Sequence, residues 1–149
     1  MSLRVPVIEL EVELTLSGGG PADHIIYLIA GSGKRPTATT LEEYLNSSRG
    51  FFPMSSAGVP RIINKAQIFW LRLPVGSLAA EEEITLVRSA TIVELLDGSR
   101  LEGYVSIGRV AGQTRISDVL NDRSVFLRLD DTTGTYFVNK AGIRVVIPG

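Results

Sequence analysis

The sequence predicts an all-β fold with short helices: two small β-barrel modules in tandem, each carrying a short helical insertion. Three observations predict this fold class. An apolar run, an Asn-Lys-Ala break and a second apolar run ending in Pro occur at residues 61–74 and again at 136–148. Apolar and polar residues alternate over Ile8–Leu16, which is the period of a half-buried strand. The dipeptide Asp97-Gly98 joins two apolar runs, as in a tight β-hairpin.

The chain repeats itself at an offset of 75 residues, which indicates two homologous units. The offset places Asn64-Lys65-Ala66 on Asn139-Lys140-Ala141, and Leu45-Asn46 on Leu120-Asn121, without a gap. A unit of half this chain buries too little surface to be stable by itself. We therefore expect the two modules to bury a common face against each other.

Small and acidic residues after Pro74 indicate the joint between the modules. We predict a first module at residues 1–75, a linker at 76–83 and a second module at 84–149. Each module is expected to contain short strands with hairpin links and one helical turn, which favours a small, strongly bent barrel.

The elements of each module follow from local patterns. In the first module, strands are expected at 8–16, 25–30, 51–54 and over 62–73. Thr39 and Thr40 precede carboxylates by three residues, a capping-box pattern that predicts the start of a helix. Pro53 indicates an edge strand or a bulge. In the second module, we expect a connecting strand at 84–87, a hairpin at 91–105, a helical turn at 116–121, and strands at 124–129, 136–139 and 143–147.

The composition is that of a globular protein without disulfides. The chain has 149 residues, of which 44% are apolar and 21% charged, and it contains no Cys, which excludes thiolate metal sites. No apolar run approaches the ~20 residues that span a bilayer, and the N-terminus has no signal-peptide core. We therefore expect no membrane partner and a cytoplasmic location.

The net charge of −1 is spread evenly along the chain. Residues 1–75 hold seven Lys and Arg against six Asp and Glu, and the remainder holds eight against ten. Non-specific nucleic-acid binding normally depends on a concentrated positive surface. The even balance counts against such binding, but it leaves room for a small local patch.

Motifs that could support catalysis have simpler explanations. Gly31–Arg35 follows a strand, but it lacks the glycine spacing and the hydroxyl of a phosphate-binding loop. His24 is the only histidine, has no Cys or serine elbow to act with, and is expected at the surface. Glu42-Glu43 and Asp118 fit the start of a helix, where carboxylates oppose the helix dipole. We therefore predict no enzymatic activity, no catalytic residue, no cofactor and no metal.

Residues 92–103 form an apolar strand, an Asp-Gly turn and a strand ending in Gly, which resembles the first Sm motif. Val138–Ala141 and Val145–Pro148 resemble the second motif of the bacterial Hfq proteins, where a basic dipeptide precedes Ala and a later strand ends in Val-Pro. The likeness covers residues 90–107 and 124–148, and it reaches the first module through the internal repeat. The resemblance implies small barrels that assemble through their edge strands into rings.

The chain departs from Sm and Hfq proteins in three respects. A segment of about 20 residues with a helical turn separates the second and third strands of each module. The Lys-His dipeptide with which Hfq contacts RNA is replaced by Asn-Lys, and two modules share one chain. The sequence is thus similar to a divergent, tandem form of the Sm-like group.

The repeated polar turns, Asn64-Lys65 and Asn139-Lys140, are the predicted ligand or RNA contacts. Asn tolerates left-handed backbone geometry, so turn formation alone could explain both copies. In an Sm-like ring the turn would face the pore, where amide and ammonium groups could bind a base or a phosphate. Four aromatic residues in apolar strand patterns could either stack on bases or belong to the core or an interface: Phe51, Phe52, Trp70 and Tyr104.

Two functions remain open from the sequence. The first is a non-enzymatic interaction or scaffold protein that forms homo-oligomers through barrel edge strands, for example three chains in a six-module ring. The alternative is an RNA-binding regulator of Hfq type that uses the Asn-Lys turns. Convergence of the basic residues on one face would favour RNA: Lys34, Arg35, Lys65, Arg109, Arg115 and Lys140.

Overall fold

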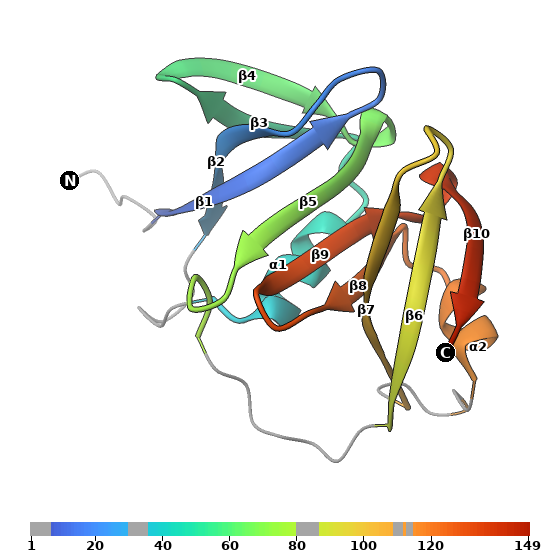
Figure 1. Cartoon of the computed structure of the whole chain (residues 1–149). Helices are drawn as coiled ribbons and strands as arrows, with labels where there is room; N and C mark the ends of the chain where they lie inside the picture. The colour runs from blue at the N-terminus through green and yellow to red at the C-terminus, as the bar shows by residue number, and fades with distance from the viewer. Residues whose placement is uncertain (1–6, 30–35, 80–86, 109–111, 113–114) are drawn as a thin grey trace.

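A computed structural model describes residues 7–29, 36–79, 87–108, 112 and 115–149 of the chain (Figure 1). The first half consists of β1 (Val7–Leu16), β2 (Ala22–Ile29), α1 (Ala38–Leu45), β3 (Phe51–Ser56), β4 (Val59–Asn64), the 3₁₀ turn η1 (Lys65–Gln67) and β5 (Ile68–Pro74). The second half consists of β6 (Val87–Leu95), β7 (Arg100–Ile107), α2 (Ile116–Leu120), β8 (Phe126–Asp130), β9 (Gly134–Asn139), the 3₁₀ turn η2 (Lys140–Gly142) and β10 (Ile143–Pro148). The prediction of an all-β fold with short helices is confirmed.

The strands form a single ten-stranded antiparallel sheet that is not closed. Their order is β10-β6-β7-β8-β9-β5-β1-β2-β3-β4, so that β4 and β10 are the two edges of the sheet. Figure 1 shows these two edge strands on opposite flanks of the molecule. Each half has the same internal order, and the pairing of β5 with β9 joins the two halves.

The order of elements repeats, but the offset between equivalent residues is not constant. From β3 onward it is 75, since β4 at 59–64 corresponds to β9 at 134–139. In the first hairpin it is 79, because Leu14 pairs with Leu71 as Val93 pairs with Val146. Counted between equivalent positions of the second and third strands, the second half is therefore four residues shorter than the first.

The helices begin for reasons that the sequence predicted only in part. Helix α1 starts after Thr37, whose hydroxyl accepts a hydrogen bond from the Thr40 N–H, so the capping box uses two threonines. The predicted box with Glu42-Glu43 was wrong, because both residues lie in later turns. In α2, Asp118 accepts a hydrogen bond from the Arg115 N–H, as its placement at a helix start predicted.

Two residues of the first half are placed differently from their predictions. His24 is buried and not at the surface, because β2 begins at Ala22 and turns position 24 inward with Ile26. Its Nε2 lies 2.7 Å from Nη1 of Arg61, which donates the hydrogen bond. Pro53 lies in β3, which is not an edge strand. Proline lacks the N–H that a strand donates to its neighbour. The pairing of β3 with β2 ends at Met54, so Pro53 costs no hydrogen bond between these two strands.

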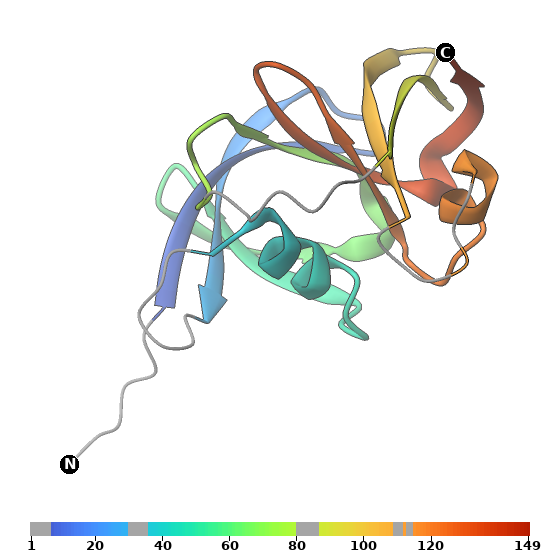
Figure 2. The ribbon, with the colours of Figure 1, turned by 90° about the horizontal axis from the view of Figure 1, so that it is seen from below.

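The core consists of two clusters of buried side chains, and each cluster includes side chains from both halves of the chain. The first core contains these buried residues: Leu10, Val12, Leu14, Ile26, Leu28, Ala38, Leu41, Leu45, Phe52, Met54, Ile63, Ile68, Leu71, Leu73, Phe126 and Phe137. The second core contains Trp70, Val93, Leu95, Val105, Leu127, Leu129 and Val138. Two phenylalanines of the second half thus lie in the first core, and one tryptophan of the first half lies in the second. Figure 2 shows the helices at separate places along the sheet, α1 against the first half and α2 against the second.

Candidate interaction site

The Asn64-Lys65 turn directs its ammonium group into the fold. Asn64 ends β4, and its Oδ1 accepts a hydrogen bond of 3.0 Å from the Ala66 N–H, which caps η1. Lys65 is buried, and its Nζ donates to the Ser47 carbonyl oxygen at 2.6 Å. The ammonium also lies 5.9 Å from the ring centroid of Phe52. Burial holds the pKa of Lys65 below its ordinary value.

Asn139 repeats the capping contact and adds a second one. Its Oδ1 accepts a hydrogen bond of 3.0 Å from the Ala141 N–H, as Asn64 does in the first half. Its Nδ2 donates to the carbonyl oxygen of Lys65 at 3.4 Å, so the two predicted turns touch each other. Asn139 is buried, whereas Asn64 is exposed.

Lys140 is also turned inward, toward the end of α2. Its Nζ donates to the Val119 carbonyl oxygen at 2.8 Å, to Asp122 Oδ1 at 2.7 Å and to Ser124 Oγ at 2.9 Å. Burial acts to raise the pKa of Asp122, but hydrogen bonds from Lys140 and Ser124 together hold it below its ordinary value. In both halves the lysine therefore ties the 3₁₀ turn to the segment that follows the helix.

The β5–β9 junction is the largest contact between the halves. Its register runs from Trp70 opposite Val138 to Pro74 opposite Gly134. The Trp70 ring meets the Tyr136 ring edge-on, with centroids 5.3 Å apart. Gly134 is required here, because a Cβ at this position would collide with the carbonyl oxygen of Leu73.

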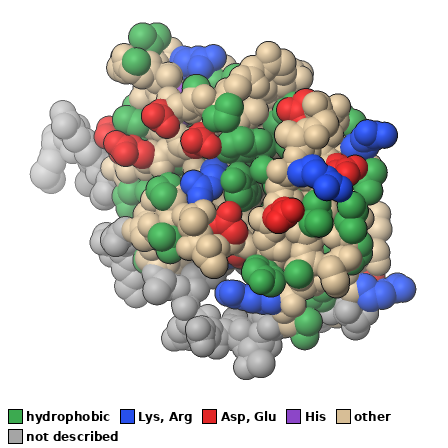
Figure 3. Space-filling view, in the orientation of Figure 1, with side chains coloured by type: hydrophobic (Ala, Val, Ile, Leu, Met, Phe, Trp, Pro, Cys, Tyr) green, Lys and Arg blue, Asp and Glu red, His purple; other side chains and the backbone are tan. Residues whose placement is uncertain are grey.

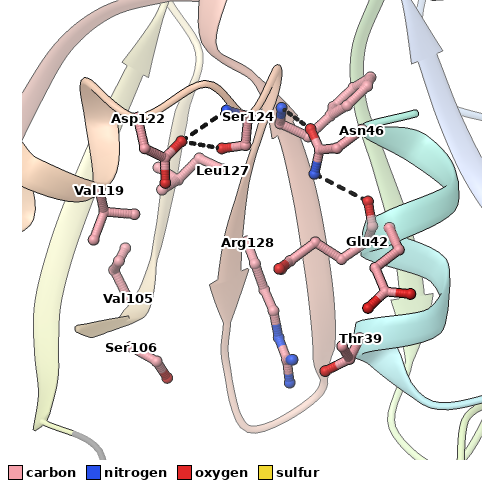
Figure 4. Close-up of a pocket in the computed structure, with 12 residues that line it drawn as sticks. Thr39, Glu42, Asn46, Val105, Ser106, Val119, Asp122, Ser124, Leu127 and Arg128 are labelled. Atoms are coloured by element: carbon pink, nitrogen blue, oxygen red, sulfur yellow. Dashed lines mark hydrogen bonds between the residues drawn. The ribbon is translucent and has the colours of Figure 1, made fainter. Parts of the chain in front are cut away.

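Asn46 provides the polar contact beside this junction (Figure 4). It follows α1, and its Nδ2 donates to the Glu42 carbonyl oxygen at 3.0 Å. Its Oδ1 accepts two backbone N–H groups at the start of β8, from Val125 at 2.7 Å and from Phe126 at 2.8 Å. One amide side chain of the first half therefore satisfies two backbone donors of the second.

The two edges of the sheet carry exposed apolar side chains. On β4 these are Val59 and Ile62, with Phe51 beside them on β3. On β10 they are Val145 and Ile147. An edge strand with apolar side chains is a template for pairing with another strand, so both edges are candidate interaction surfaces.

A groove of about 330 Å³ lies between the two halves, lined by α1, β7, β8 and the end of α2 (Figure 4). Its polar lining includes Glu42, Glu43 and Arg128. The Arg128 Nε forms hydrogen bonds with both carboxylate oxygens of Asp130, at 3.3 and 3.1 Å. No group of three metal-ligating side chains occurs in the described part of the chain.

The predicted basic residues do not form one described surface. Lys34, Arg35 and Arg109 lie outside the described residues. Arg115 is exposed, whereas Lys65 and Lys140 point inward. On the face seen in Figure 3, basic and acidic side chains are interspersed. The use of the Asn-Lys turns in ligand or RNA contacts stays a prediction.

The aromatic predictions divide between core and surface, and one polar residue was missed. Phe52 and Trp70 are buried, whereas Phe51 and Tyr104 are exposed. The contact made by Asn46 was not predicted. Its signal was the presence of Asn at both equivalent positions, immediately after a leucine that ends a helix.

Comparisons of the chain with protein-family models, with curated proteins and with solved structures found no match. Among the described residues, no helix is long and apolar enough to cross a bilayer. The geometry of the turns, the junction and the edges is therefore the basis for the function proposed below.

Proposed function

We propose that the protein is a non-enzymatic interaction or scaffold protein that forms homo-oligomers through the edges of its sheet. The observation that carries this proposal is the exposure of apolar side chains on both edge strands, β4 and β10. In the repeat, β9 is the equivalent of β4 and β5 is the equivalent of β10. These two equivalent strands pair with each other inside the chain. Pairing of the free edges would remove the exposed apolar surface in the same way.

The proposal includes the assignment of each half to a small Sm-like barrel. Five antiparallel strands per half, with one helix between the second and the third, support it. The pairing between these two strands is short in both halves, with Ile25 and Ile26 paired to β3 and Tyr104 alone paired to β8. Such short pairing allows the strong bend that a small barrel needs. The absence of Cys favours the cytoplasm as its location.

Sedimentation velocity across a concentration series tests the proposal. We expect species larger than the 16.1 kDa chain at micromolar concentration. Ile62→Glu should abolish them by placing a charge on the β4 edge. The matched control is Val75→Glu, because Val75 is 75% exposed, as Ile62 is at 76%, but lies after β5 and away from both edges. A wild-type protein that stays monomeric up to 100 µM would contradict the proposal.

RNA binding is the second candidate, and the exposed amide of Asn64 beside a lysine favours it. Fluorescence anisotropy with labelled oligo-U and oligo-A, at low and then increasing salt, distinguishes the two functions. The scaffold proposal predicts no salt-sensitive binding. Binding that is lost in Lys65→Ala/Lys140→Ala would favour RNA. Because both lysines also hold the fold, removing them is expected to lower the Tm, so binding of that variant is measured at a temperature below its own unfolding transition.

A further inference from the structure

We infer that the β4 edge of one chain pairs with β10 of a second copy, head to tail, in the register of the internal β5–β9 junction, and completes the second core of that copy. This inference rests on the proposed function, since it names the contact through which the chain would self-associate. It follows from the repeat: β10 is the equivalent of β5, and β4 is the equivalent of β9. The internal junction is therefore a template for the external one.

The offset of 75 residues fixes the partners in that contact. Trp70 opposite Val138 corresponds to Val145 opposite Ile63 of the second copy. Leu71 opposite Phe137 corresponds to Val146 opposite Ile62 of the second copy. The side chains that pair inside the chain and those that would pair between chains are apolar at all of these positions.

The side chains that would be inserted are exposed in the single chain. Phe126 and Phe137, which enter the first core from the second half, are 2% and 0% exposed. Their equivalents in the first half, Phe51 and Ile62, are 56% and 76% exposed. Phe51 of β3 and Ile62 of β4 are thus displayed at this end of the sheet, at the positions where the equivalent residues are buried.

The second core lacks the cover that the first core has. Leu41 and Leu45 of α1 are fully buried under the first core. None of the residues of α2 is buried, and its residues Ile116 and Leu120 are only partly covered, as is Val146 of β10. Phe51 and Ile62 of a second copy would cover this region, as Phe126 and Phe137 cover the first core.

The residue equivalent to Asn46 is Asn121, and it makes only part of the contacts that Asn46 makes. Asn121 follows α2 as Asn46 follows α1, and its Nδ2 donates to the Ser117 carbonyl oxygen at 2.8 Å. Among the described residues, no hydrogen bond reaches its Oδ1, although Asn46 Oδ1 accepts two. In the assembly, Asn121 Oδ1 would accept the N–H groups of Gly50 and Phe51 of the second copy.

The same equivalence predicts a contact between chains for the side chain of Asn64. Inside the chain, Asn139 Nδ2 donates to the Lys65 carbonyl oxygen. The equivalent contact joins Asn64 Nδ2 to the Lys140 carbonyl oxygen of a second copy. The exposed amide of the first Asn-Lys turn is then a contact between chains, and its location at the edge of the sheet agrees with that use.

The external contact is expected to end before Val59. Val59 is the equivalent of Gly134, whose Cβ would collide with the carbonyl oxygen of Leu73. Pro148 is the equivalent of Leu73, so the Val59 side chain would collide with the Pro148 carbonyl oxygen of the second copy. The pairing should therefore extend over about four residues of each strand, which is short for a strand pair. Because the contact joins two different edges, it repeats indefinitely unless it closes into a ring, and three chains would supply six modules.

Single cysteines test the register directly, since the chain has no Cys of its own. Residues directly opposite each other in antiparallel strands have Cα atoms about 4.5–5.5 Å apart, within reach of a disulfide. Ile62→Cys and Val146→Cys are purified separately, mixed at micromolar concentration and oxidised mildly. We expect a covalent dimer in the mixture and none with either variant alone.

A displaced pair serves as the control for this experiment. Ile147 is one residue from Val146, so its side chain points to the other face of the sheet. A mixture of Ile62→Cys and Ile147→Cys should therefore give at least tenfold less dimer. Equal cross-linking in that mixture, or cross-linking of Ile62→Cys with itself, would overturn the register or the head-to-tail arrangement.

Sedimentation separates failure of this inference from failure of the proposed function. If wild-type chains associate but Ile62→Cys and Val146→Cys do not cross-link, the register is wrong and assembly through another contact stands. If wild-type chains do not associate at any concentration, both proposals fall. Asn121→Ala provides an independent measurement: it should weaken association at least tenfold but lower the Tm of the dilute protein only slightly, since it removes one hydrogen bond, to the Ser117 carbonyl oxygen.

Discussion

The two halves contain the same elements in the same order, but only the first has a closed core. Leu41 and Leu45 of its helix are fully buried in a cluster that also contains Phe126 and Phe137 of the other half. The second half has the equivalent helix, yet the residues that would cover it, Phe51 and Ile62, lie at the opposite edge of the sheet. A repeated unit of this size is thus completed by its neighbour, and the last unit in the chain has no neighbour within the chain.

The largest expected difference between the halves concerns Phe137 and its equivalent Ile62. Phe137→Ala should lower the free energy of unfolding by about 3–5 kcal/mol, because it leaves a cavity in the first core. Ile62→Ala should change it by less than about 0.5 kcal/mol in dilute protein, where its side chain faces solvent. Urea unfolding followed by the fluorescence of Trp70, the only tryptophan, measures both. Equal losses in dilute protein would show that the halves do not differ in this way.

The second difference concerns Asn46 and Asn121. Asn46→Ala leaves the backbone N–H groups of Val125 and Phe126 without their acceptor, which should cost about 2–3 kcal/mol of stability. Asn121→Ala should cost under about 0.5 kcal/mol in dilute protein. Asn46→Asp keeps an acceptor oxygen and should recover part of the loss. An Asn46→Ala variant as stable as the wild type in urea would contradict the importance of this contact.

The third difference concerns Gly134 and its equivalent Val59. Gly134→Ala should destabilise the chain by about 1–3 kcal/mol, because the added methyl group meets the Leu73 carbonyl oxygen across the junction. Val59→Gly should cost less than about 1 kcal/mol in dilute protein. It should also tighten self-association, since it removes the side chain that ends the external pairing. Weaker association of Val59→Gly in sedimentation would argue against the copied register.

The smallest expected difference between the halves is in the pH dependence of stability. It involves the equivalent positions Ser47 and Asp122. Lys65 is tied to a carbonyl oxygen, which does not titrate, whereas Lys140 is tied to a carboxylate. Because the pKa of Asp122 is lowered in the folded state, its contribution to stability is present above the unfolded pKa of about 3.9 and is lost as the pH falls through the folded pKa.

Asp122→Asn checks this pH dependence. The variant should be less stable than the wild type by about 0.5 kcal/mol at pH 7, where the ion pair exists. The difference should shrink as urea unfolding is repeated toward pH 3 and below. A difference that stays constant down to pH 2 would mean that the hydrogen bonds of Asp122, and not its charge, account for the effect.

Local structure could be predicted from the sequence, because it depends on neighbouring residues. The alternation in β1, the turn at Asp97-Gly98 and the apolar runs around the Asn-Lys turns each specify a strand or a turn directly. His24 shows the limit of this reasoning. Its burial depends on where β2 begins and on Arg61, which lies 37 residues away.

The arrangement of the halves could not be predicted, because equivalent residues have different surroundings. Phe51 and Phe126 are the same residue type at equivalent positions of the repeat, yet one is exposed and the other buried. Asn46 and Asn121 differ in the same manner. Only the pairing of β5 with β9 decides which member of each pair finds a partner.

That pairing also has a consequence for folding kinetics. The hairpins β1–β2 and β6–β7 close over short stretches of chain, whereas Asn139 and Lys65 meet across 74 residues. Contacts of such long sequence separation form late. Before β9 pairs with β5, a refolding chain exposes four strand edges instead of two. During this time β9 of another chain can pair with β5 in its place. Refolding at high concentration should therefore trap swapped dimers, and refolding at high dilution should favour the closed monomer.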